Sequence, residues 1–302
     1  MSRPSKNIII SVRNNKLATA VAKHCKYTLL TVEDKRFANN EDYIKIPCDG
    51  STVREAKAIL FLPDETNPND ILVKTVLFSD AIWRMRPASI VLVMPIVPYS
   101  RQDCVITSGE CLSSHAIARV LSVCNLDEII TIDMHSAQLA MAFDCPVTEL
   151  SAICLLASAV NKLGLIDPVV VSPDIGGTKR ASKFAAILGL DILFTHKTRT
   201  TTANIDKVVL DHEIINNKDA IIIDDMIDSG NTIIVTAKQL RRIGARKIVA
   251  CATHGVFSTN AIKMLNLSDI DTIITTDSIS FAKPRPKKFR TVSVAQLIAS
   301  AL

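Results

Sequence analysis

The stretch from Ala220 to Thr232, AIIIDDMIDSGNT, places two adjacent aspartates and then a third one directly after an apolar run. Buried carboxylates are costly unless a cation or a hydrogen-bond donor meets them, so the pattern indicates either a binding site or a solvated strand end. The turn Asp228–Thr232 leads into an apolar spacing typical of a helix. Backbone N–H groups at such a turn and at a helix N-terminus form a cradle for an anion, which Ser229 and Thr232 extend with hydroxyl donors.

The two carboxylates of Asp224 and Asp225 cannot bind phosphate themselves. They can accept hydrogen bonds from sugar hydroxyls, directly or through a magnesium ion. A phosphate cradle with carboxylates beside it therefore suits a ribose phosphate. The GxxxxGK[ST] pattern of P-loop proteins is absent, so this is a different kind of phosphate site.

The composition predicts a cytoplasmic protein with reduced cysteines. The chain has 302 residues, of which 48% are hydrophobic and 4% aromatic, which fits an α/β protein with sizeable cores. Its longest apolar runs, such as Ile90–Val97, are too short to span a membrane, and no secretory signal is evident. The eight cysteines show no CxxC pair and no metal-binding spacing.

The net charge of +5 is modest, and phosphorylated small molecules suit it better than nucleic acid. One basic run, KPRPKKFR at 283–290, is compatible with a nucleic-acid patch. A solvated loop explains the run equally well, because no interleaved aromatics offer stacking. We therefore expect neither nucleic acid nor a membrane as a partner.

Short apolar runs alternate with helical patterns along the chain, which predicts parallel sheets with helices on both sides. The expected strands have continuous apolar character: NIIISV, SIVLVMPIV, EIITIDM, PVVVSP, AIIIDD, KIVACATH and DTIITTD. The expected helices lie in LSSHAIARVLSVC, SAICLLASAVNKLG, TKRASKFAAILG and NTIIVTAKQLRRIG. Gly164, Gly189 and Gly244 each follow a helical pattern, where a left-handed C-cap is favoured.

A boundary near residue 150 predicts two related domains, 1–150 and 151–302. Each half contains a strand that runs into a polar turn, VLVMPIVPYSRQD in the first and AIIIDDMIDSGNT in the second. Ligands of open α/β sheets gather beyond the carboxyl ends of strands, where these turns lie.

Several motifs together resemble a known family. The stretch Asp224–Thr232 resembles the PRPP-binding motif of the type I phosphoribosyltransferase fold. PYSRQD, TIDMHSAQ, VVSPDIGG and HKTRT occur in the order found in ribose-phosphate pyrophosphokinases (PRPP synthetases), and RFANNEDYIKI is similar to that family's Phe-x-Asp-Gly-Glu segment. The resemblance covers nearly the whole chain. It implies two phosphoribosyltransferase-like domains, each a mainly parallel sheet flanked by helices.

The resemblance also implies a reaction: diphosphoryl transfer from ATP to ribose 5-phosphate, with Mg²⁺ as cofactor, by a homo-oligomer built from dimers, up to a hexamer. It assigns roles to matching positions. The implied catalytic residues are Lys197 and Arg199, and the implied metal ligands are His135 and Asp174. The implied ATP-binding residues are Phe37, Asn39, Asn40, Glu41, Arg101, Gln102 and Asp103, the first four from a neighbouring subunit. The implied ribose 5-phosphate-binding residues are Arg199, Asp224, Asp225, Asp228, Ser229, Gly230, Asn231 and Thr232, and Gly176 and Gly177 are implied to approach the diphosphate.

The sequence departs from the family pattern at three places: Asn39–Asn40 replace Asp and Gly, Asn231 replaces a usual glycine, and Cys104–His115 lacks the usual basic residues. Three alternatives remain open: a non-catalytic regulatory homologue, a phosphoribosyltransferase that uses PRPP, and a PRPP- or nucleotide-sensing nucleic-acid regulator that uses the basic run 283–290. Without the resemblance, Lys197 and Arg199 would be interpreted as two solvated cations in a threonine-rich segment that is expected to be a mobile loop. The order of the motifs overturns that interpretation.

Overall fold

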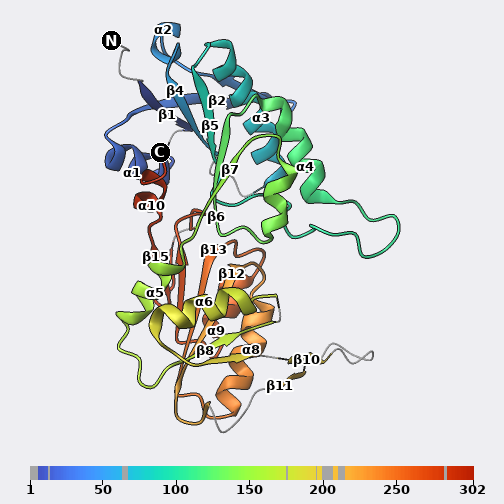
Figure 1. Ribbon diagram of the computed structural model, residues 1–302, viewed down its shortest axis with the longest axis vertical. Coiled ribbons are helices and arrows are strands. Elements are labelled where there is room, and N and C mark those ends of the chain that lie inside the picture. The colour runs from blue at the N-terminus through green and yellow to red at the C-terminus, as the bar shows by residue number, and fades with distance from the viewer. Residues whose placement is uncertain are drawn as a thin grey trace. The chain divides into compact units, whose positions relative to one another are not determined.

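The computed structural model describes residues 6–12, 14–62, 67–174, 176–194, 196–198, 207–209, 215–281 and 284–302. The chain forms two compact units (Figure 1). Unit 1 comprises residues 1–150 together with 295–302, and unit 2 comprises residues 151–294. The predicted second domain extended to residue 302, whereas the last eight residues of the chain pack with unit 1.

Unit 1 contains a seven-stranded sheet in the order β3-β2-β1-β4-β5-β6-β7. All neighbours are parallel except β2 and β3, which form an antiparallel hairpin. The strands are β1 Asn7–Val12, β2 Thr28–Arg36, β3 Asp42–Lys45, β4 Lys57–Phe61, β5 Ser89–Val93, β6 Glu128–Ile132 and β7 Val147–Leu150. The central strands β1, β4, β5 and β6 are almost wholly buried, as expected for parallel strands covered on both faces.

The helices of unit 1 cover this sheet. They are α1 Lys16–Cys25, α2 Gly50–Val53, α3 Pro68–Arg84, α4 Ser113–Leu121, η1 Ser122–Cys124, η2 Ala137–Ala142 and α10 Ala295–Ala299. Leu72, Phe78 and Ile82 of α3 pack into the core against β4 and β5. The last helix, α10, packs beside α1, where the Cys25 thiol lies 3.7 Å from the Ala299 carbonyl oxygen.

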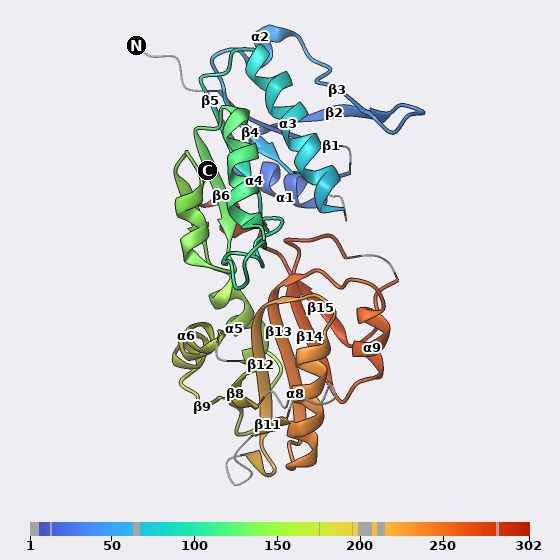
Figure 2. The same cartoon turned by 90° about the vertical axis from the view of Figure 1, so that its right-hand side faces the viewer.

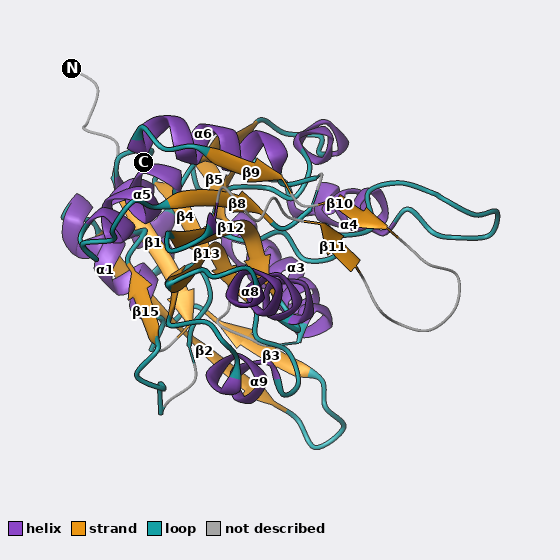
Figure 3. Cartoon of the chain, turned by 90° about the horizontal axis from the view of Figure 1, so that it is seen from below, coloured by secondary structure: helices purple, strands orange, loops and turns teal. Residues whose placement is uncertain are grey.

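Unit 2 contains a six-stranded, wholly parallel sheet in the order β15-β14-β13-β12-β8-β9. Its strands are β8 Val169–Ser172, β9 Ile192–Phe194, β12 Asp219–Ile227, β13 Lys247–Gly255, β14 Thr272–Thr276 and β15 Phe289–Val292. A separate antiparallel pair, β10 His196–Thr198 and β11 Lys207–Val209, lies outside this sheet (Figure 3).

Helices cover both faces of the unit 2 sheet (Figure 2). They are α5 Ile153–Asn161, α6 Thr178–Leu188, α8 Asn231–Arg242 and α9 Ala261–Leu267. Alternate strand residues face opposite sides. Ile222 and Ala250 therefore pack with α8 and α9, whereas Ile221 and Val249 pack with α5 and α6.

The predicted fold class, α/β with two mainly parallel sheets flanked by helices, is confirmed. Every run predicted as a strand contains one, and every predicted helical segment contains a helix. Gly164, Gly189 and Gly244 all have the expected positive φ, between 60° and 93°. Within the described ranges, no helix combines the length and the apolar character needed to cross a membrane.

Candidate functional site

The turn between β12 and α8 has the geometry of an anion cradle. Gly230 adopts φ 78° at the N-cap of α8, and a Cβ there would lie 3.0 Å from the Leu265 side chain, so both conformation and space favour glycine. The first N–H groups of a helix have no partner within the helix, and they carry the positive end of its dipole. Ser229 and Asn231 are exposed beside them, and the Asn231 N–H lies 3.5 Å from Ser229 Oγ. This turn can hold a phosphate.

The acidic pair lies near the end of the same strand. Asp225 is buried, Asp224 is half-buried, and the Asp225 N–H donates to Asp224 Oδ1 at 2.9 Å. Burial, and then the hydrogen bond and charge of Asp225, raise the pKa of the Asp224 carboxyl to about 8. In the absence of a further cation, the pair therefore retains a proton near neutral pH.

Arg180, on the first turn of α6, is a site residue that the sequence interpretation missed. Its Nη1 lies 3.4 Å from Asp224 Oδ1 and 3.6 Å from Asp225 Oδ1. The guanidinium lowers the pKa of Asp224, against the larger effects of burial and of Asp225. The only sequence signal for Arg180 is its place three residues after the Gly176–Gly177 turn, because its partners lie 44 residues away.

A second turn follows β8, the strand beside β12 in the sheet. Asp174 Oδ1 accepts a hydrogen bond from the Gly177 N–H at 2.9 Å, and Ser172 Oγ donates to the Asp174 carbonyl at 2.7 Å. A Cβ at Gly177 would lie 3.0 Å from Ser172 Oγ, so a side chain there would require the Ser172 hydroxyl to shift. Because β8 and β12 are parallel, both turns lie at the carboxyl edge of the unit 2 sheet.

Unit 1 also carries predicted site residues at the carboxyl edge of its sheet. Arg101–Asp103 follow β5 and His135 follows β6, and these strands are parallel neighbours. Asp133 adopts φ 39°, and its N–H donates to the Leu150 carbonyl of β7 at 2.9 Å. Arg101 and His135 are exposed, whereas Gln102 and Asp103 are half-buried.

The predicted adenine segment, Phe37–Glu41, forms the tip of the β2–β3 hairpin (Figure 2). The tip is closed by the Phe37 N–H, which donates to the Glu41 carbonyl at 2.8 Å, and Asn40 supplies the positive φ of 69° that the turn needs. Phe37 is 55% exposed. β1 and β4 separate β2 from β5, so within the sheet this hairpin lies apart from Arg101 and Gln102.

The remaining predicted residues lie in or beside β10. Lys197 is the central residue of β10, paired in register with Val208 of β11, so this part of the expected loop is a short strand. The side chain of Lys197 and the whole of Arg199 lie outside the described residues.

The basic run at 283–290 is partly occupied by contacts within unit 2. The Arg285 guanidinium lies 4.7 Å from the centre of the Phe281 ring, and Lys288 Nζ donates to the Ser268 carbonyl at 2.8 Å. Among the described residues, no group of three or more histidine, cysteine, aspartate or glutamate side chains is arranged to hold a metal ion.

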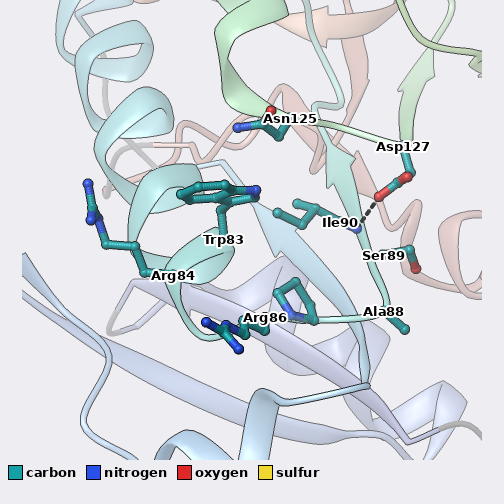
Figure 4. A pocket seen from close by; sticks show the side chains of 9 residues that line it. Trp83, Arg84, Arg86, Ala88, Ser89, Ile90, Asn125 and Asp127 are labelled. Atoms are coloured by element: carbon teal, nitrogen blue, oxygen red, sulfur yellow. Dashed lines mark hydrogen bonds between the residues drawn. The ribbon is translucent and has the colours of Figure 1, made fainter.

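An open pocket of about 770 Å³ lies at the other edge of the unit 1 sheet, where β5 begins (Figure 4). Trp83, Arg84 and Arg86 at the end of α3 line it together with Asn125 and Asp127. Asp127 Oδ2 accepts a hydrogen bond from the Ile90 N–H at 2.7 Å, and Arg84 forms an ion pair with Asp80 at 2.8 Å. None of the predicted site residues lines this pocket.

Comparisons with known proteins lead to the same family that the order of the sequence motifs resembles. Residues 7–124 match the family described as the N-terminal domain of ribose phosphate pyrophosphokinase, and residues 208–302 match the phosphoribosyl synthetase-associated domain. The chain is 34% identical to the ribose-phosphate pyrophosphokinase of Thermotoga maritima, over 96% of this chain and 91% of that protein. It is also 34% identical to the enzyme of the same name from Vibrio parahaemolyticus, over 95% of this chain and 91% of that protein.

Almost the whole chain has a fold similar to that of a solved structure. The crystal structure of phosphoribosylpyrophosphate synthetase from Mycobacterium smegmatis superposes with a TM-score of 0.89 and 31% identity. The match covers 98% of this chain and 97% of that one.

Proposed function

This chain belongs to the ribose-phosphate pyrophosphokinase family, and from that premise we propose that it makes PRPP. The reaction transfers the β,γ-diphosphate of ATP to ribose 5-phosphate. The sugar 1-hydroxyl loses its proton and forms a bond to the β-phosphorus, the bond from that phosphorus to the oxygen bridging to the α-phosphate breaks, and AMP leaves. Such transfers need little covalent protein chemistry, since positioning and charge neutralisation supply most of the catalysis.

The observation that carries this proposal is the anion cradle beside the acidic pair in unit 2. The 5-phosphate of ribose 5-phosphate would accept hydrogen bonds from the N–H groups and hydroxyls of Asp228–Thr232. The carboxylates of Asp224 and Asp225 would orient the ribose hydroxyls. A free phosphate has no such hydroxyls and would not need these carboxylates. This combination fits a sugar phosphate better than a free phosphate.

ATP is assigned to unit 1. Arg101 has a guanidinium that can meet polyphosphate or stack on adenine, and Gln102 and Asp103 lie beside it. The exposed hairpin tip Phe37–Glu41 would supply its adenine contacts to a neighbouring subunit, because β1 and β4 separate it from the ATP residues of its own chain. On the family resemblance, the proposed enzyme is a cytoplasmic homo-oligomer built from dimers.

The donor chemistry fits Mg²⁺ carried in with ATP. Asp174 uses Oδ1 to accept from Gly177, and among the described residues Oδ2 has no partner. His135 is exposed at the end of β6 and is the second proposed ligand. Mg²⁺ takes few protein ligands and keeps several waters, so each of these side chains is by itself a suitable ligand. When bound, the ion would neutralise part of the phosphate charge.

Lys197 and Arg199 are the proposed catalytic cations. They would stabilise charge that develops on the transferred group and on the leaving oxygen, while Gly176 and Gly177 allow the backbone to approach the diphosphate. An assay of AMP release with Mg-ATP tests the whole proposal. AMP and PRPP should form only when ribose 5-phosphate is present; release of ADP, or no turnover with magnesium present, would contradict it.

A non-catalytic regulatory member of the family is the second candidate. Two departures favour it: Asn39–Asn40 lie in the segment assigned to adenine, and Cys104–His115, which follows the ATP-binding residues, lacks the family's usual basic residues. The purified chain would then bind a catalytic homologue and alter its rate without releasing AMP itself. A phosphoribosyltransferase would instead consume PRPP and a nitrogen base. It would release no AMP in the same assay, which distinguishes it from a PRPP synthetase.

A further inference from the structure

The side chain of Gln102 is held by two residues in the segment where the chain departs from its family. Gln102 Oε1 accepts a hydrogen bond from the Cys111 thiol at 3.3 Å and another, shorter one from the Ser113 hydroxyl. Cys111 Sγ and Ser113 Oγ also lie 3.2 Å apart, so the three groups form a closed triangle. An amide oxygen has two lone pairs, and these two donors occupy both.

The backbone reinforces the same connection. The Gln102 carbonyl accepts a hydrogen bond from the Ser114 N–H at 3.2 Å, and Ser114 is buried in the first turn of α4. The segment between Gln102 and Cys111 is exposed, with Ile106 82% accessible, and Glu110 accepts hydrogen bonds from the Ile106 and Thr107 N–H groups. Gln102 is therefore fixed to the start of α4, while the loop between them closes on itself.

The other end of the amide remains available. Among the described residues, Gln102 Nε2 donates to no protein group, and the residue is half-buried rather than covered. An untethered glutamine can rotate its amide and offer either an oxygen or an N–H₂ group to a ligand. With Oε1 occupied, the two N–H donors are the part of the Gln102 amide that can still meet a ligand.

We propose that Cys111 and Ser113 are positioning residues that make Gln102 a pure hydrogen-bond donor toward the bound nucleotide. Gln102 would then contact acceptor atoms, either a phosphate oxygen or an unprotonated ring nitrogen, and could not accept from the exocyclic amino group of adenine. The inference rests on the proposed function, because it assumes that Gln102 contacts ATP.

Equilibrium binding of a non-hydrolysable ATP analogue to the purified full-length chain tests the proposal. The variant Cys111→Ala/Ser113→Ala should bind the analogue about 3- to 10-fold more weakly, the scale of one or two lost hydrogen bonds. Cys111→Ser/Ser113→Ala should recover most of that loss, since serine restores an O–H donor at position 111. In a Gln102→Ala background the double alanine substitution should have no further effect, because the group that it positions is gone.

Cys104→Ala is the matched control. Cys104 is exposed in the same loop, and within the described residues it makes no contact with Gln102, so its loss should leave affinity unchanged. Equal weakening by Cys104→Ala, no weakening by the double alanine variant, or full additivity with Gln102→Ala would each overturn the proposal. Thermal unfolding of every variant excludes a general loss of folding.

Two further measurements separate this inference from the proposed function and identify the acceptor. If no AMP is released but the binding cycle behaves as stated, the positioning role stands and the proposed reaction fails. If AMP is released but the cycle is additive, the reaction stands and the positioning role fails. Repeating the cycle with tripolyphosphate identifies the atom contacted: a retained effect indicates a phosphate oxygen, and a lost effect indicates a ring nitrogen.

Discussion

Asp224, Asp225 and Arg180 form a close, largely buried group of charges in unit 2. Two carboxylates side by side repel each other, and burial adds a desolvation cost that one guanidinium at 3.4 and 3.6 Å offsets in part. Such an arrangement costs stability in the free protein and is suited to receiving a further cation or a set of hydroxyl donors. At the residue scale, these charges are therefore expected to reduce the stability of the free protein, which is consistent with the proposed binding role.

The raised pKa of Asp224 predicts a pH-dependent stability. Its folded-state pKa, about 8, lies above the ordinary value of 3.8, so between these values the folded state binds more protons than the unfolded state. The free energy of unfolding should therefore fall as the pH rises from about 4 to about 8. Asp224→Asn removes this titration, so the variant should lose less stability than the parent over that window. Urea unfolding at pH 5 and pH 8 measures both slopes; parallel slopes would contradict the prediction.

Replacement of Arg180 tests the other side of the same cluster. Arg180→Met should destabilise the protein by about 1–3 kcal/mol at pH 8, less than for a fully buried pair because the guanidinium is 21% exposed. Arg180→Lys keeps the charge and should cost less. In an Asp224→Asn background the cost of Arg180→Met should shrink, since fewer charges remain unpaired. A cost unchanged by Asp224→Asn would show that Arg180 acts through other contacts.

Lys197 is predicted to act on turnover rather than on folding. Lys197→Ala should lower kcat by about two to four orders of magnitude, the scale for losing a preorganised charge at a developing anion. The KM values should change much less, because the contact strengthens in the transition state. Arg199→Ala should act in the same direction. Kinetics alongside thermal unfolding check this; near-normal turnover of Lys197→Ala would remove the residue from the mechanism.

At the scale of elements, the β12–α8 turn joins a buried strand to the helix whose N-terminus is the proposed phosphate site. Gly230→Ala should cost about 1–2 kcal/mol for the left-handed conformation, plus the cost of a Cβ that meets Leu265 at 3.0 Å. Gly189→Ala is the matched control, since Gly189 has φ 65° and open space around its Cβ position. Urea unfolding should show the larger loss for Gly230→Ala, and calorimetry should show weaker ribose 5-phosphate binding for that variant alone. Equal losses would mean that Leu265 does not restrict the turn.

Several strands are predicted from the sequence because their burial is continuous, whereas β4, which shows the same burial, is not among the predicted strands. β1, β5 and β12 each contain an unbroken apolar run, because both faces of that part of the strand are covered, and this pattern is visible locally. The β2–β3 hairpin was noted only as a family segment, because its residues are mostly half-buried or exposed and show no such run. The sequence alone does not reveal the contacts of Arg180 and Cys111, because their partners, Asp224 and Gln102, are brought close only by the fold.

At the scale of the whole molecule, the chain returns to the unit in which it began. After completing unit 2, it adds α10 to unit 1, where Ile298 is fully buried and Lys57 Nζ donates to the Leu302 carbonyl at 3.4 Å. A single predicted boundary near residue 150 places residues 295–302 in the second domain, whereas in the structure they pack with unit 1. The C-terminal residues should therefore affect the stability of the N-terminal unit.

Ile298→Ala tests that consequence. Truncating a fully buried isoleucine should cost about 2–5 kcal/mol, whereas Gln296→Ala on the exposed side of α10 should stay within about 0.5 kcal/mol. The single tryptophan of the chain, Trp83, lies in unit 1, so its fluorescence reports on that unit during urea unfolding. The Trp83 transition should shift to lower urea in Ile298→Ala and remain in place in Gln296→Ala. If the fluorescence transition stays fixed while the circular dichroism transition moves, α10 stabilises unit 2 instead, and the assignment of residues 295–302 to unit 1 fails.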